Sequence, residues 1–379
     1  MMNRVLVRLL AILAASIAIA VGVLRLQQQR TNLPSWASGG QVYDGYLTID
    51  GHAYRALAIR EWLAGRDPGA VSLLELLRTD AHATTVTIPL AAAAVSLMGL
   101  SIPASFAFVV VLVFLGTMHL AGVLARQMIR EGEGRMEGEP PVYWCTWWYL
   151  GLHFASTRTV GLLILDWGVA MSAVGTTLYA MKWARTPSLT NVTAMAVFMT
   201  FGLLTKVSAL PFCVVPLLFV CLHKEDVRVR LHMLCVAMLA VSCGLVAMGI
   251  VSYVAHGVDP LERDVGHMIE NSRLRVGEFL VEMVLLFQLA PMVLAVAPPK
   301  ARASHIVGLC ALVYLISVWV FRLPSTPRLY LPALSLGVPL IVASAYSWVG
   351  RTWVLWTYGI INLGLTGWVL LGATSSPLK

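Results

Sequence analysis

Apolar runs long enough to cross a lipid bilayer recur from one end of this sequence to the other. The clearest are residues 5–24, 103–125 and 231–254, which carry almost no charged side chains. About 20 apolar residues in a helix span a hydrocarbon core about 30 Å thick, and a helix satisfies all its backbone hydrogen bonds within the segment. The pattern therefore predicts an all-α, polytopic helical membrane protein.

The composition supports this class. Of the 379 residues, 58% are hydrophobic and 12% are charged, whereas soluble domains carry about 25% charged residues. All six cysteines lie inside or at the ends of apolar runs, so we interpret them as small core residues and not as disulfides or metal ligands. The net charge of +8 is typical of loops near anionic lipid headgroups and gives no indication of nucleic acid.

The runs predict about eleven transmembrane helices in a single domain, residues 1–379, with no separate soluble domain. Residues 25–87 form a long first extracytoplasmic loop. Residues 88–100 are apolar but give only about 20 Å of helix, which is too short to span, so we expect a juxtamembrane helix in the outer interface. Residues 255–278 form a second polar outer loop.

The distribution of lysine and arginine predicts the orientation. Short inner loops are expected to be basic. The cations on the predicted inner side are Arg4, Arg8, Arg126, Arg130, Arg135, Lys182, Arg185, Lys224, Arg228, Arg230, Lys300, Arg302 and Arg351. Four others, Arg158, Lys206, Arg322 and Arg328, fall at outer span ends, where this rule disfavours them. Binding an anion is the simplest reason for their position.

One stretch of the first outer loop, residues 48–54, brings an acid, an imidazole and a phenol together as Asp50, His52 and Tyr54. A loosely amphipathic helix is expected to follow over residues 55–67. Asp50 then occupies the position of a helix N-cap. The alternative is a catalytic carboxylate that faces the outer membrane surface.

The outer face is thus predicted to gather carboxylates, among them Asp50 and Asp166, with the four span-end cations and His82. This combination suits transfer from a lipid phosphate. Nucleotide sugars are generally absent outside the cytoplasm, so a sugar donor there is expected on a polyprenyl phosphate. Its anionic phosphate leaves without a general acid, so one carboxylate that acts as base for the acceptor hydroxyl suffices.

Each of these residues also has a simpler interpretation. Asp166 can cap the helix that starts at residue 167, Lys206 can snorkel from a helix end, and Arg328 can be an interfacial anchor. His52 and His82 can be plain loop residues. On the residues alone these alternatives stay open.

Short segments between residues 45 and 340 add an ordered set of motifs. They are Asp50-Gly51-His52-Ala53-Tyr54, Ile88-Pro89-Leu90 with Met98-Gly99-Leu100-Ser101, Arg158 followed by Asp166, Gly202-Leu203-Leu204-Thr205-Lys206, and Pro327-Arg328-Leu329-Tyr330-Leu331-Pro332. In this order they resemble the GT-C glycosyltransferase superfamily, in its protein-mannosyltransferase-like and lipid A aminoarabinose-transferase-like branch. The resemblance departs at Gly51, where the family has Glu, and at Ile88, where it has a second proline.

The resemblance implies a hexosyl- or pentosyltransferase in a bacterial inner or plasma membrane, with its site facing outward. It would move a sugar from a polyprenyl-phosphate donor to a glycan, lipid or protein acceptor. Its implied catalytic residues are Asp50, as general base, and Asp166. Its implied substrate-binding residues are Tyr54, His82, Arg158, Lys206 and Arg328. No cofactor is implied for certain, and a divalent metal stays open.

Two alternatives of other classes remain. One is a transporter or flippase for an anionic lipid or sugar, which would place its charges near mid-membrane on broken helices of two matching halves. Only the region from Lys206 to Pro216 has the pattern of a broken helix, and no second half mirrors it. The other is a catalytically inactive GT-C-like relative, because Gly51 replaces the motif's second acid.

Overall fold

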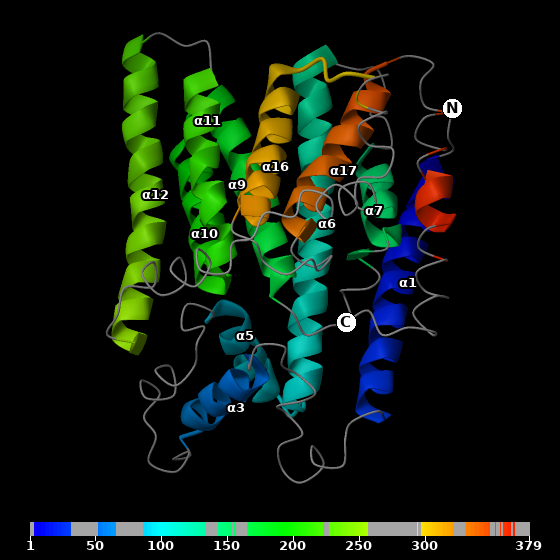
Figure 1. Ribbon diagram of the computed structural model, residues 1–379, viewed down its shortest axis with the longest axis vertical. Coiled ribbons are helices and arrows are strands. Elements are labelled where there is room, and N and C mark those ends of the chain that lie inside the picture. Colours follow the sequence, from blue (N-terminus) through cyan, green and yellow to red (C-terminus); the bar gives the residue numbers. More distant parts are fainter. Residues whose placement is uncertain are drawn as a thin grey trace.

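The computed structural model describes the chain in several stretches. They are residues 4–31, 52–65, 86–133, 142–153, 155–156, 165–222, 227–256, 294, 297–320, 330–348, 353, 357, 359–364 and 367. Every regular element in these stretches is a helix, so the prediction of an all-α fold is confirmed. Figure 1 shows long helices standing side by side, with two short helices lying across one end of the bundle.

The described helices follow the predicted spans. The longer ones are α1 (Arg4–Thr31), α6 (Ile102–Glu133), α9 (Asp166–Arg185), α10 (Leu189–Thr205), α12 (Val227–His256), α16 (Arg302–Val320) and α17 (Leu331–Tyr346). The shorter ones are α3 (His52–Leu63), α5 (Thr87–Ser96), α7 (Val142–Leu152), the 3₁₀ helix η2 (Val207–Val214) and α11 (Val215–Leu222). By length and composition, Ala104–Gly132 and Val227–Val251 are long and apolar enough to cross a membrane, and the remaining apolar helices are shorter. Two further apolar runs predict crossings, one over residues 279–296 and one that ends at residue 371; most of their residues lie outside the described stretches.

Helix α9 is the central helix of the bundle. It contacts α6, α10, α11 and α17, and most of its side chains are buried. Two glycines allow the close packing: a Cβ added at Gly175 would lie 2.4 Å from the Phe198 ring, and one at Gly202 would lie 2.1 Å from Ser172 Oγ. Helices α9 and α10 therefore pack closely against each other at both places.

The two ends of the bundle differ in charge. Basic side chains occupy the end where α1 begins, α6 and α9 finish, and α12 and α16 begin (Figure 1). We call this the cationic end; its members are Arg8, Arg126, Arg130, Lys182, Arg185, Arg228, Arg230, Lys300 and Arg302. The opposite end carries α3, α5, the start of α9 and the end of α10 (Figure 1), and we call it the site end.

The predicted helix break after α10 is present. Lys206 has extended backbone angles, φ −165° and ψ 138°, between the end of α10 and the start of η2. Pro211 lies inside η2, where the missing N–H disfavours a regular α-helix. The helical geometry is therefore interrupted at Lys206, which the sequence analysis singled out as a candidate substrate-binding residue.

The two short helices of the site end are shorter at their C-termini than predicted. The helix expected at 55–67 is α3, which begins earlier, at His52, and stops at Leu63 before Gly65 (φ +66°). Residues 88–100 contain α5, which stops at Ser96 before Gly99 (φ +96°). Positive φ is accessible to glycine at little cost and commonly terminates helices. These glycines explain both early ends.

Candidate functional site

Two residues singled out from the sequence form an ion pair at the site end. Lys206 Nζ donates a hydrogen bond to Asp166 Oδ1 at 3.1 Å. The Asp166 side chain is 2% exposed and that of Lys206 is 22% exposed. The carboxylate therefore lies inside the bundle, and the ammonium lies between it and the surface.

This ion pair argues against the simpler interpretation of each residue, the helix cap for Asp166 and the snorkelling side chain for Lys206. The N-cap of α9 is Leu165, and no side chain caps the helix; the capping interpretation of Asp166 is therefore wrong, because its carboxylate bonds Lys206 instead. The Lys206 ammonium bonds a buried acid, which a snorkelling lysine would not do.

The pair has unused hydrogen-bonding capacity. Asp166 Oδ2 is buried without a hydrogen-bond partner among the described residues, and so is Nε1 of the neighbouring Trp167. An ammonium has three N–H donors, and one of them bonds Asp166. Buried polar atoms are nearly always satisfied, so the free carboxylate oxygen makes the pair a candidate for binding a polar ligand.

Aromatic side chains line the neighbourhood of the pair. Tyr314 of α16 is fully buried, stacks on Phe212 at 4.8 Å between ring centroids, and is close enough to Asp166 to feel its charge. Trp167 meets Phe114 edge to face at 4.7 Å. Sequence reasoning missed Tyr314, because a single tyrosine in an apolar run carries no signal of a site.

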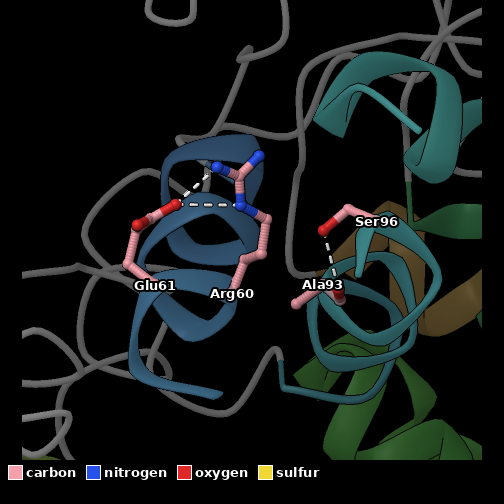
Figure 2. Close-up of polar contacts among 4 residues, drawn as sticks. All are labelled: Arg60, Glu61, Ala93 and Ser96. Atoms are coloured by element: carbon pink, nitrogen blue, oxygen red, sulfur yellow. Dashed lines mark hydrogen bonds and ion pairs between the residues drawn. The ribbon is translucent and has the colours of Figure 1, made fainter. Parts of the chain in front are cut away.

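The short helices α5 and α3 complete the site end. The N–H of Val86, just before α5, donates to the Leu204 carbonyl at 2.9 Å. Helix α3 packs on α5, with Ala56 and Ile59 buried. Figure 2 shows the two helices side by side, with the Arg60–Glu61 ion pair on α3 (Nε–Oε1 2.9 Å). Arg60 thus already has an acidic partner on its own helix.

The remaining candidates cannot be placed in the same way. Asp50, His82, Arg158 and Arg328 lie outside the described residues. Tyr54 lies in the first turn of α3, but its side chain is not described. Their roles stay predictions. No group of three or more His, Cys, Asp and Glu side chains in the described stretches could hold a metal ion.

Comparison with known proteins gives one informative match. No protein-family profile and no curated protein matches the chain. Among solved structures, the crystal structure of ArnT from Cupriavidus metallidurans bound to undecaprenyl phosphate superposes with a TM-score of 0.63 at 14% identity, covering 97% of this chain and 66% of that one. The chain thus spans about two thirds of the length of that structure. The chain shares the overall fold of that structure, which agrees with the resemblance that the motifs indicated.

Proposed function

We propose that this chain is a membrane glycosyltransferase that moves a sugar from a polyprenyl-phosphate donor to an acceptor on the extracytoplasmic face. The observation that carries the proposal is the Lys206–Asp166 pair at the site end, with an unused carboxylate oxygen and unused ammonium donors. The shared fold supports it, since the matching ArnT structure is bound to undecaprenyl phosphate.

In this proposal Lys206 binds the donor phosphate. A phosphate oxygen would accept charge-assisted hydrogen bonds from the remaining Lys206 donors, which are about twice as strong as neutral ones. Asp166 holds the ammonium in place through the 3.1 Å bond. Arg158 and Arg328, the other predicted cations, would share the phosphate charge.

The transfer step needs one base. Asp50 would take the proton from the acceptor hydroxyl, whose oxygen then attacks the anomeric carbon of the sugar. The bond between that carbon and the phosphate oxygen breaks, and the polyprenyl phosphate leaves as an anion, which needs no proton because its second pKa is near 6. Tyr54 and His82 are proposed to contact the transferred hexose or pentose. The acceptor is a glycan, lipid or protein.

The structure gives less support to a transporter. Among the described residues, Asp166 is the only Asp, Glu, Lys or Arg that is buried, and it stands at the first residue of α9. A transporter would hold its charges near mid-membrane on broken helices. An inactive relative differs from the enzyme only in chemistry, so a direct assay must separate these two.

The test uses the full chain in nanodiscs with a panel of polyprenyl-phosphate sugars. The expected result is release of polyprenyl phosphate with transfer of the sugar. Binding of undecaprenyl phosphate without cleavage of any donor would support the inactive relative. Movement of an intact donor between the leaflets of vesicles, without cleavage, would support the transporter.

Orientation is tested separately in intact cells. Single cysteines replace Gly45 or Gly134 in a background without native cysteines, and a membrane-impermeant thiol reagent is added. Because residues 25–87 are predicted outside and residues 126–139 inside, only position 45 should react. Labelling at position 134 would contradict the outward-facing site.

A further inference from the structure

The start of α5 is fastened to the end of α10 by two adjacent hydrogen bonds. Val86 N–H donates to the Leu204 carbonyl at 2.9 Å, which gives a partner to one of the last carbonyls of α10 that the helix itself leaves unpaired. Beside it, the hydroxyl oxygens of Thr87 and Thr205 lie 2.6 Å apart. We call this hydroxyl pair the Thr87–Thr205 clasp.

The clasp has a definite direction. The Thr205 hydroxyl donates to the Phe201 carbonyl at 2.6 Å. A hydroxyl carries one hydrogen, so Thr205 must accept the bond from Thr87. Thr205 is fully buried, so solvent cannot replace Thr87 as the donor. Removal of the hydroxyl from either threonine therefore breaks the clasp.

A third helix meets the clasp at a glycine. A Cβ at Gly168 of α9 would lie 2.7 Å from Thr205 Cγ2 and 2.9 Å from Ile88 Cδ1. Helices α5, α9 and α10 therefore touch at one place. Asp166 stands two residues before Gly168, and Lys206 directly follows Thr205, so the clasp adjoins both partners of the ion pair.

We propose that the Thr87–Thr205 clasp is a positioning element that sets α5, and α3 packed on it, against the Lys206–Asp166 pair. The inference rests on the proposed function, in which Asp50, two residues before α3, must reach an acceptor next to a phosphate on Lys206. Loss of the clasp leaves the Lys206–Asp166 bond in place but frees α5, and α3 packed on it, to shift relative to that pair. A shift of about 1 Å can cost about 100-fold in rate, so turnover falls while donor binding is kept.

The kinetic test compares Thr87→Val and Thr205→Val in nanodiscs. We expect kcat to fall by about 10-fold or more, with KM for the donor and binding of undecaprenyl phosphate within about twofold of wild type. Thr87→Ser and Thr205→Ser keep a hydroxyl and should restore kcat. Because both valines break the same bond, the double variant should be no slower than the slower single variant.

The matched control is Thr177→Val. Thr177 is a fully buried threonine of α9 whose hydroxyl donates to the Ala173 carbonyl of its own helix at 2.7 Å. The substitution makes the same chemical change but removes a hydrogen bond within one helix instead of one between helices, so kcat should stay at the wild-type value. Wild-type kcat in both clasp variants, or an equal fall in the control, would overturn the proposal.

A second measurement does not depend on turnover. Spin labels at Met98, after α5, and Val197, on α10, occupy exposed positions in a cysteine-free background. Their distance distribution should broaden in Thr87→Val and Thr205→Val but not in Thr177→Val. An unchanged distribution in both clasp variants overturns the clasp. If wild type cleaves no donor but the distribution broadens, the clasp is supported and the proposed function fails.

Discussion

The two ends of the bundle both hold cations, but with different partners. At the site end, Lys206 bonds a buried carboxylate at 3.1 Å. At the cationic end, basic groups stack on aromatic rings. These stacks are Arg8 over Trp144 at 5.9 Å, Arg126 over Tyr143 at 4.7 Å, Lys182 over Tyr179 at 4.8 Å and Lys300 over Trp348 at 4.7 Å from the ring centroids.

The difference separates anchoring from function. A cation over an aromatic face is favourable by about 0.5–1 kcal/mol when exposed, and basic and aromatic residues at a membrane boundary are the ordinary means of anchoring a helix. A buried ion pair is costly to desolvate and is weak evidence of stability. This contrast is consistent with the proposal that Lys206 and Asp166 serve a ligand and that the cationic end anchors the protein in its membrane.

Asp50→Asn should have the largest effect. Asn is nearly as good an N-cap as Asp, so a purely structural role predicts an unchanged protein. The Asn side chain cannot accept a proton, however, and proton transfer by a positioned base raises the reaction rate by about 10²- to 10⁴-fold. Turnover of a cleavable donor should therefore fall by at least about 100-fold while undecaprenyl phosphate binding and thermal stability are kept, and Asp50→Glu should be intermediate. Normal turnover of the Asn variant would leave Asp50 without a catalytic role.

Lys206→Ala should weaken donor binding next. A lost charge-assisted hydrogen bond costs about 1.5–3 kcal/mol, which corresponds to about 10- to 100-fold in Kd. Titration of the protein in nanodiscs with undecaprenyl phosphate measures this Kd. The Lys206→Arg variant should recover part of the lost affinity, because the positive charge is kept with a different geometry. Arg126→Gln is the control from the cationic end. If both variants bind the lipid equally well, the two ends do not differ in function.

Glycine substitutions compare packing near the site with packing far from it. A Cβ at Gly202 would lie 2.1 Å from Ser172 Oγ, whereas one at Gly249 of α12 would meet nothing within 4 Å. Gly202→Ala should destabilise the protein by about 1–3 kcal/mol through overpacking, and Gly249→Ala should stabilise it by about 0.5–1 kcal/mol. Thermal unfolding in one detergent compares them. A similar shift for both would mean that α9 and α10 are less closely packed than described.

Arg8→Gln should have the smallest effect. Loss of the Arg8 guanidinium removes one stacking contact with Trp144, which stabilises the protein by about 0.5–1 kcal/mol. Thermal stability should fall slightly, with kcat and donor KM unchanged. A loss of turnover comparable to that of Lys206→Ala would show that the cationic end takes part in the reaction.

The sequence predicted the bundle and the members of the ion pair, and the pairing itself follows from topology. Helices α9 and α10 are of similar length and joined by a short turn, so the start of one must lie near the end of the other. The Thr87–Thr205 clasp could not be predicted, because threonine hydroxyls in apolar segments usually bond their own helix, as Thr177 does. Tyr314 was missed for the same reason: side-chain contacts between helices leave no periodic or charge pattern in the sequence.

The chain direction of α9 and α10 has an electrostatic consequence for the ion pair. Aligned peptide dipoles give a helix about half a positive charge at its amino end and about half a negative charge at its carboxyl end. Asp166 stands at the amino end of α9, and Lys206 directly follows the carboxyl end of α10. Each side chain is thus stabilised by the backbone of its own helix, by about 0.3–1 kcal/mol. The reverse arrangement, a base on α9 and an acid after α10, would oppose both dipoles, so the polarity of this helical hairpin favours the observed placement of the acid and the base.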